Sequence, residues 1–208
     1  MTSAQPSDLQ QILGYQGAID EPLHHQDQAD GSLNDQVQVI GQDLLVMPFW
    51  TPTFCATVIR AAEAIGAFEP QPDDPVPGHE VSLALISPRL FEAVQDDLGA
   101  RIWPKLRTVW PYVDYYGIRD AFVIRYAMGE QESLRIHHDV AQVSGSVKLN
   151  DHYQGAELSF PRQQVDNSQI PIGQLVVWPS LVTHPHQTEQ LRSGVKYALT
   201  IWFEVPSF

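Results

Sequence analysis

The second half of the chain is divided into short apolar runs separated by turn residues, and this pattern limits the possible folds more than any other feature. Each run has the length of a strand and is too short for an amphipathic helix. The runs are Ala121–Tyr126, Leu134–His137, Gly145–Leu149, Glu157–Phe160, Gln174–Trp178 and Tyr197–Val205. Short strands at this spacing predict an antiparallel β-barrel or β-sandwich.

The first half of the chain predicts helices. Thr51-Pro52 is a helix start, because Thr suits the N-cap and Pro the first helical position, and Gly66 suits the end of that helix. Ser87-Pro88 starts a second helix in the same way, and Pro104 is expected to break or restart it. Residues 36–47 alternate enough to form one or two strands. The pattern therefore favours helices first and an antiparallel β core after them.

Composition suggests a polar arm and a single domain. Residues 1–36 are rich in Gln, Asp and Ser, and we expect an N-terminal arm there. Residues 37–208 are numerous enough for one domain with a full hydrophobic core, and 43% apolar against 18% charged residues is a globular balance. The start of the chain does not resemble a signal peptide, and the one cysteine, Cys55, excludes an internal disulfide framework. We therefore expect a cytoplasmic protein with Cys55 as a small buried residue.

Charge narrows the choice of partners. The formal net charge of −13 repels the phosphates of nucleic acids and acidic membrane surfaces. No apolar run approaches the roughly 18 residues of a membrane-spanning helix. We therefore expect neither nucleic acid nor membrane as a partner, which leaves a peptide, a protein or a small molecule. The sequence does not indicate an oligomeric state.

A His-x-Asp triplet is the first indication of chemistry. Residues two apart in a strand point to the same face of the sheet, so His137 and Asp139 can offer an imidazole and a carboxylate to one metal ion. His138 would then point the other way. Such triplets also arise by chance, so this one predicts a metal site only together with further ligands.

A third ligand is available downstream. His184 and His186 follow Trp178-Pro179-Ser180, and either histidine on a distant strand would complete a set of two histidines and one carboxylate. Such a facial triad leaves coordination positions open, which suits Fe(II) reacting with O2. A structural zinc site would prefer four ligands, usually with thiolates, and Cys55 is far away in the sequence.

Lys196 is the third indication, because it lies within an otherwise apolar strand. If its side chain faces the interior, it needs an anionic partner, since burial of an unpaired charge is unfavourable. The alternative is an exposed lysine on an edge strand. The sequence around Lys196 does not decide between the two.

These motifs occur together and in order, and between about Asp120 and Phe203 the chain resembles the 2-oxoglutarate and Fe(II)-dependent oxygenases. Within that family the resemblance is to the prolyl 4-hydroxylase-like group. The matching motifs are Arg125-Tyr126-x-x-Gly129, His137-x-Asp139, Leu149-Asn150-x-x-Tyr153-x-Gly155-Ala156-Glu157-Leu158-x-Phe160-Pro161, Gly173, Trp178-Pro179-Ser180, the distal histidine, and Gly194-x-Lys196-Tyr197-x-Leu199-Thr200-x-Trp202. The resemblance implies an α+β fold with a double-stranded β-helix (jelly-roll) core and N-terminal supporting helices.

The resemblance also implies roles for individual residues. His137 and Asp139 match iron ligands, and Lys196 matches the basic residue that binds the far carboxylate of 2-oxoglutarate. Tyr126 and Thr200 match positions that add hydrogen bonds near this cosubstrate; the alternative for each is core packing. Lys148 replaces a tyrosine that relatives often carry, and the sequence does not say whether it contacts the cosubstrate or solvent.

The distal ligand requires a choice between two histidines. Counted forward from Ser180, His184 occupies the ligand position; counted back from Gly194 and Lys196, His186 does. Relatives keep the interval between the histidine and the basic residue nearly constant, because both groups reach one cosubstrate. We therefore predict that His137, Asp139 and His186 are the metal ligands and the catalytic centre.

The implied reaction is hydroxylation of an unactivated C–H bond by O2, coupled to decarboxylation of 2-oxoglutarate to succinate. Fe(II) is the implied cofactor, with ascorbate as a candidate reductant. Asp139 favours hydroxylation, because a halogenating relative would lack this carboxylate. The expected substrate is a prolyl residue of a peptide or protein, or a free amino acid or other small molecule. The alternative is a non-catalytic metal- or ligand-binding β-barrel of the cupin type, which would not require Lys196 at that interval.

Overall fold

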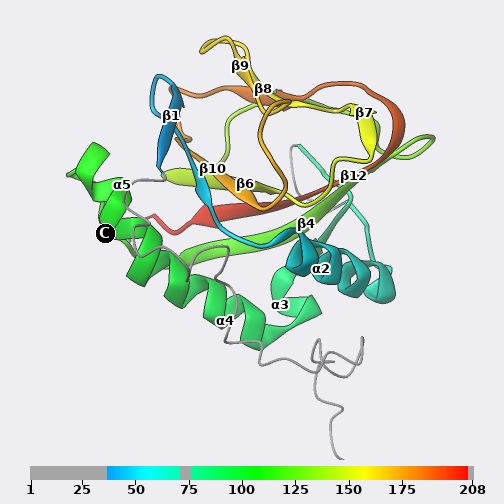
Figure 1. Cartoon of the computed structure of the whole chain (residues 1–208), viewed down its shortest axis with the longest axis horizontal. Helices are drawn as coiled ribbons and strands as arrows, with labels where there is room; N and C mark the ends of the chain where they lie inside the picture. Colours follow the sequence, from blue (N-terminus) through cyan, green and yellow to red (C-terminus); the bar gives the residue numbers. More distant parts are fainter. Residues whose placement is uncertain (1–36, 71–75, 206–208) are drawn as a thin grey trace, which may run out of the picture.

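The computed structural model describes residues 37–70 and 76–205, so the predicted arm at residues 1–36 lies outside the described residues. Two antiparallel sheets face each other, and helices cover the outer face of the larger sheet (Figure 1). Helices precede most of the strands in the chain, as expected. No helix within the described ranges is both long and apolar enough to cross a membrane.

Within the described residues the larger sheet has eight strands, in the order β1-β2-β10-β6-β12-β4-β3, with β7 paired to β12. All pairings among these strands are antiparallel. The strands are β1 (Gln38–Gly41), β2 (Leu44–Pro48), β3 (Glu80–Ser82), β4 (Ile118–Ala127), β6 (Val143–Lys148), β7 (Tyr153–Gly155), β10 (Gln174–Pro179) and β12 (Leu191–Phe203).

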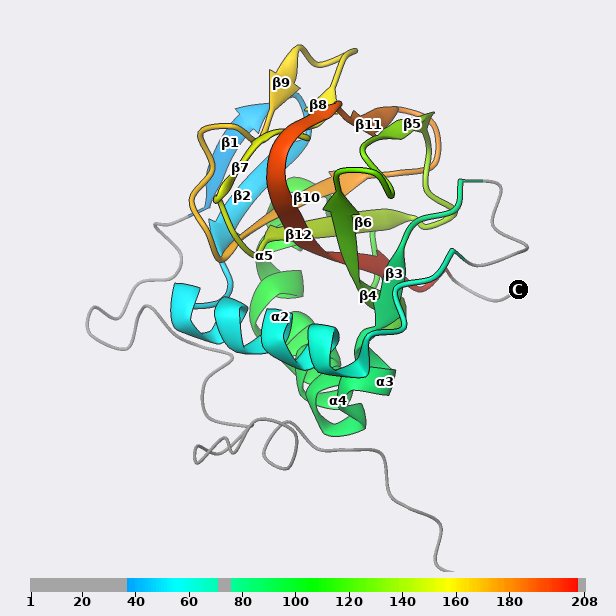
Figure 2. The same ribbon diagram turned by 90° about the vertical axis from the view of Figure 1, so that its right-hand side faces the viewer.

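The smaller sheet has four described strands in the order β5-β11-β8-β9. They are β5 (Leu134–His137), β8 (Leu158–Phe160), β9 (Val165–Asp166) and β11 (His186–Thr188). In Figure 2, β5 and β11 lie above β6 and β12 of the larger sheet. The sequence pattern predicted β5 and β8 but not the very short β9 and β11, which have too few residues to show an alternation.

Helices α2 (Pro52–Ile65) and α4 (Pro88–Asp97) begin where the sequence predicts. The side chains of Thr51 and Ser87 accept hydrogen bonds from the backbone N–H of the third residue of each helix, at 3.2 Å in both cases. Gly66 ends α2 in the left-handed conformation, with φ of 69°. Helix α3 (Leu83–Ile86) is a single turn between β3 and α4.

Pro104 lies where an α-helix restarts, as predicted. A π-helical turn, Leu98–Ile102, continues α4 directly into α5 (Trp103–Val109), and Pro104 lies in the first turn of α5. A proline lacks the N–H of an α-helical hydrogen bond and its ring clashes with the carbonyl four residues earlier. The wider π turn is a common way to accommodate such an interruption.

The alternation of residues along the strands of the larger sheet separates a structural face from a functional one. Ala121 and Val123 of β4 belong to the main core, where they pack together with residues of α2, α4 and α5. Phe122, Ile124 and Tyr126 of the same strand point to the other face, toward the smaller sheet. The space between the two sheets is where the predicted site residues meet.

Candidate metal and cosubstrate site

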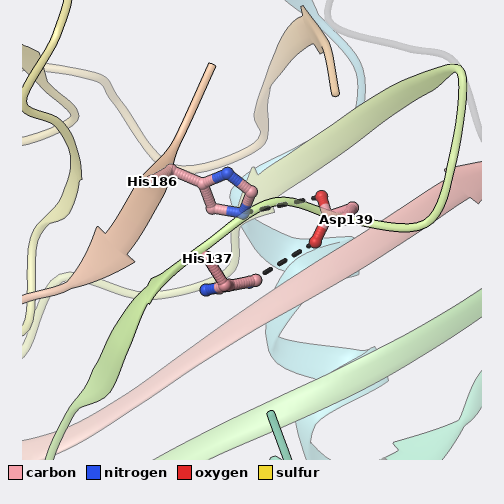
Figure 3. Close-up of side chains that lie close together, drawn as sticks. All are labelled: His137, Asp139 and His186. Carbon is pink, nitrogen blue, oxygen red and sulfur yellow. Dashed lines mark ion pairs between the residues drawn. The ribbon is translucent and has the colours of Figure 1, made fainter. Parts of the chain in front are cut away.

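The structure brings His137, Asp139 and His186 together (Figure 3). His137 is the last residue of β5 and His186 the first of β11, and the two lie opposite each other in the antiparallel pairing. One ligand atom from each of the three residues lies within 4.8 Å of the others. Nε2 of His137 is 3.4 Å from Oδ1 of Asp139, and Nε2 of His186 is 3.5 Å from its Oδ2.

Asp139 reaches this position from a connection, whereas the sequence predicted that it lies in a strand. Strand β5 ends at His137, so Asp139 lies in the following connection rather than in a strand. The alternation of side chains along a strand, by which we expected Asp139 to lie beside His137, therefore does not explain the position of Asp139. The adjacent His138 does point elsewhere: its Nε2 is 3.2 Å from the carbonyl oxygen of Val182, at the exposed edge of the site.

Both histidine rings are oriented by backbone carbonyls. Nδ1 of His137 lies 2.8 Å from the oxygen of Arg135, and Nδ1 of His186 lies 3.1 Å from the oxygen of His184. A carbonyl only accepts hydrogen bonds, so each Nδ1 is the protonated nitrogen. The lone pair of each Nε2 is then directed toward Asp139, as a metal ligand requires.

The electrostatics of the group suit a bound cation. The Asp139 side chain is only 3% exposed, and its Oδ2 is a buried oxygen without a hydrogen-bond partner among the described residues. Burial by itself raises the pKa of Asp139, but the close imidazoles of His137 and His186 outweigh this effect and hold the pKa well below its usual range. Burial by itself lowers the pKa of His137, but the neighbouring carboxylate of Asp139 and the carbonyl of Arg135 outweigh this effect, so the pKa is raised. A divalent ion would satisfy all three groups at once.

The donor set fits Fe(II) better than structural zinc. Two imidazoles and one carboxylate on one side of an ion leave further positions open. Cys55, the only cysteine, is buried in α2, and burial raises the pKa of its thiol to about 12. It is therefore a packed core residue, as expected, rather than a fourth ligand.

His184 lies outside the group. Its ring is 1% exposed, with Nε2 2.9 Å from the carbonyl oxygen of Gln42 and Nδ1 2.8 Å from the hydroxyl of Thr183. Both nitrogens are thus occupied by the protein. Of the two candidates, His186 is the one that the structure places beside His137 and Asp139.

A cavity of about 320 Å³ between the two sheets contains the three residues and the predicted cosubstrate contacts, Lys196, Tyr126 and Thr200. Lys196 is 2% exposed, so the edge-strand alternative is wrong. Within the described residues, its Nζ donates to the carbonyl oxygen of Ala156 at 2.7 Å and forms no ion pair. Burial lowers the pKa of Lys196 to about 7. The cavity therefore presents a buried amine that an anionic ligand would stabilise as an ammonium.

The neighbours of Lys196 are polar as well. Tyr126 lies opposite it on β4, with the ring centroid 4.9 Å from Nζ, and its hydroxyl accepts a 3.0 Å hydrogen bond from Thr188. Thr188 was not among the predicted site residues, because β11 was not recognised in the sequence. Lys148 pairs with Ala198 and lies on the inner face, but it does not line the cavity.

Comparison with known proteins agrees with this geometry. Residues 121–204 match the sequence model of the family described as the 2OG-Fe(II) oxygenase superfamily. A procollagen lysine hydroxylase and glycosyltransferase from Caenorhabditis elegans is 31% identical over 81 residues, which are 38% of this chain and 11% of that protein. A procollagen lysyl hydroxylase and glycosyltransferase from Acanthamoeba polyphaga mimivirus is 24% identical over 77% of this chain and 19% of its own length. The chain thus spans only a small part of these relatives.

Solved structures show the same fold at low sequence identity. The viral collagen prolyl hydroxylase of Paramecium bursaria Chlorella virus-1, in complex with 2-oxoglutarate, has a TM-score of 0.60 and 18% identity, covering 80% of this chain and 98% of that one. A Pseudomonas putida prolyl 4-hydroxylase has a TM-score of 0.58 and 20% identity, covering 79% and 94%. The predicted double-stranded β-helix core is therefore confirmed.

The family resemblance stated from the motifs is confirmed by these matches. Iron and 2-oxoglutarate are the cofactor and cosubstrate that this family implies. The assignment of individual residues to them remains a prediction.

Proposed function

We propose that this chain is an Fe(II)- and 2-oxoglutarate-dependent dioxygenase that hydroxylates an unactivated C–H bond and converts 2-oxoglutarate to succinate and CO2. The observation that carries the proposal is that the two histidines, the carboxylate and a buried lysine line one cavity. A non-catalytic cupin-type barrel would explain the metal ligands. It would not explain a lysine buried in the same cavity without a carboxylate partner among the described residues.

In this proposal His137, Asp139 and His186 hold Fe(II) through two Nε2 atoms and the carboxylate. When bound, iron and 2-oxoglutarate together supply the oxidising power that activates O2. The carbonyls of Arg135 and His184 keep both rings oriented while the ion binds.

Lys196 binds the far carboxylate of 2-oxoglutarate. To do so its ammonium leaves the carbonyl of Ala156 or shares its three donors with it. Tyr126 and Thr200 add hydroxyl groups to the same part of the cavity wall. The apolar side chains around them exclude water from this end of the cavity.

The proposed substrate is a residue of a peptide or protein, or a free amino acid or related small molecule. Among the structural relatives is a Trichoplax adhaerens prolyl hydroxylase in complex with a peptide fragment of hypoxia inducible factor. Curated relatives are named for procollagen lysine. These names support an amino-acid side chain as the reacting group.

Succinate formation tests the proposal. The purified protein with Fe(II), 2-oxoglutarate, O2 and ascorbate should release succinate, slowly in the absence of substrate. His137→Ala should abolish both metal binding and succinate release, whereas His152→Ala, which removes a 92% exposed histidine side chain, should change neither. If iron-loaded protein neither binds 2-oxoglutarate nor forms succinate, the proposal is wrong.

A further inference from the structure

One stretch of the cavity has no part in the function proposed above. It is lined by the carboxylate of Asp120 and the ring of Phe122 on β4, by the ring of Trp202 on β12, and by the exposed Arg119 of β4. None of these residues takes part in holding the metal or 2-oxoglutarate. They therefore form the wall available to the substrate.

The strand register places this stretch at the opposite end of the cavity from Lys196. Lys196 lies opposite Tyr126, and six residues further along β12, Trp202 lies opposite Asp120. Six residues of strand span roughly 20 Å. The cavity therefore has a cationic end at Lys196, which suits the dianion 2-oxoglutarate, and an acidic end that is formed by the carboxylate of Asp120.

The acidic end is close enough to the metal ligands for one side chain to bridge the distance. Trp202 also lies opposite Ser144 of β6, whose hydroxyl contributes a hydrogen bond that lowers the pKa of Asp139. Asp120 of β4 and Ser144 of β6 thus lie on the two strands that flank β12, about 10 Å apart across the sheet. A long side chain anchored at Asp120 would cross Trp202 and present its carbons to the metal centre.

The charge of Asp120 is not matched by a buried cation in the described part of the chain. The residue is half-buried, and burial raises the pKa of its carboxyl, against smaller opposing effects of the Ala121 N–H and the Arg119 charge. Arg119 is exposed, and its guanidinium donates to the carbonyl oxygen of Val140 at 2.9 Å. A cation entering the cavity would complete the pairing.

The aromatic residues independently favour a cation. The rings of Phe122 and Trp202 meet edge to face at 5.2 Å beside Asp120. Ring faces next to a carboxylate are a combination that binds ammonium groups and packs against their alkyl stems. The indole N–H of Trp178 on β10, beside His186 in the same cavity, is buried and has no hydrogen-bond partner in the described part of the chain, so the cavity also offers a donor to a polar group of a ligand.

We propose that the Asp120 end of the cavity binds the cationic head of a lysine-type side chain, so that the substrate is a basic residue of a peptide or a free basic amino acid. This inference rests on the proposed function, because it assigns the substrate of that same cavity. A neutral prolyl ring would bring no positive charge to the carboxylate of Asp120.

Substrate-stimulated succinate release and binding to the loaded protein test the inference. The probes are acetyl-Gly-Xaa-Gly-amide peptides in which Xaa is lysine, norleucine or proline, together with free L-lysine. The lysine peptide should stimulate succinate release and bind the Mn(II)- and 2-oxoglutarate-loaded protein in calorimetry, with norleucine and proline at least about tenfold weaker. Stimulation by free lysine alone would assign a small-molecule substrate with the same cationic chemistry.

Charge variants distinguish a direct contact between the ligand and Asp120 from the effect of the protein's overall negative charge. Asp120→Asn should weaken binding of the lysine ligand by about tenfold or more, and Asp120→Glu should restore part of it. Glu92→Gln removes the same charge from the exposed side of α4 and should have little effect. Equal stimulation by the norleucine or proline peptide would overturn the inference and leave the proposed function intact. Failure to bind 2-oxoglutarate would overturn both.

Discussion

Replacing Lys196 by methionine is expected to stabilise the ligand-free protein and to abolish its response to 2-oxoglutarate. Burial lowers the pKa of Lys196 from 10.5 to about 7. Below pH 7 the folded and the unfolded protein both carry the proton, and keeping this charge buried then costs up to about 5 kcal/mol of unfolding free energy. Methionine removes that cost but leaves the carbonyl of Ala156 without its hydrogen bond, at a cost of about 1–3 kcal/mol.

The expected net gain is about 2–4 kcal/mol, which raises the melting temperature by roughly 5–10 °C in a chain of this size. The gain depends on pH in a defined direction. Because the folded-state pKa is the lower one, the penalty is complete below about pH 7 and disappears as the pH rises toward the ordinary value of 10.5. The stability difference between Lys196→Met and the wild type should therefore shrink between these pH values.

Thermal unfolding at pH 6.5 and pH 9.5, with and without 2-oxoglutarate and Mn(II), measures both effects. In the wild type, 2-oxoglutarate at about 100 times its Kd should add about 2.7 kcal/mol. In Lys196→Met this increment should be lost. Lys105→Met is the matched control, since Lys105 lies on α5 against the other face of the larger sheet. A variant that is less stable than the wild type at pH 6.5, or that keeps the 2-oxoglutarate increment, would refute the reasoning.

Three further predictions concern the ligand choice and the core. His186→Ala should abolish the stabilisation by Mn(II). His184→Ala should keep this stabilisation but lower the free energy of unfolding by about 1–3 kcal/mol, because it removes buried hydrogen bonds. If metal titrations show loss of binding in His184→Ala and normal binding in His186→Ala, His184 is the ligand. Gly173→Ala should unfold at clearly lower denaturant concentration, because its Cβ would overlap a backbone carbonyl, and Gly129→Ala, which has a similar positive φ but open space, should cost only about 1 kcal/mol. Cys55, with its pKa raised to about 12, should react with a thiol reagent only on unfolding; rapid labelling of the native protein would contradict its burial.

Local features of the fold could be predicted because their causes lie in neighbouring residues. The Thr51 and Ser87 caps and the Gly66 end position depend on hydrogen bonds and backbone conformations within one turn of helix. The longer strands could be predicted from apolar alternation. The restart of the helix at Pro104 could be predicted too, but the π turn before it could not, because a π turn depends on how α4 and α5 pack on the sheet.

By itself the sequence determined the family resemblance and the set of residue types: a His-x-Asp triplet, two distant histidines as candidates for a third ligand, and a lysine at a fixed interval after them. Only the tertiary structure decided which of these groups meet. Strand register places His186 opposite His137, and the loop after β5, rather than the strand, brings Asp139 to them. The same register buries Lys196 at one end of the cavity and puts Asp120 at the other. Such contacts join residues distant in the chain, so no local pattern contains them.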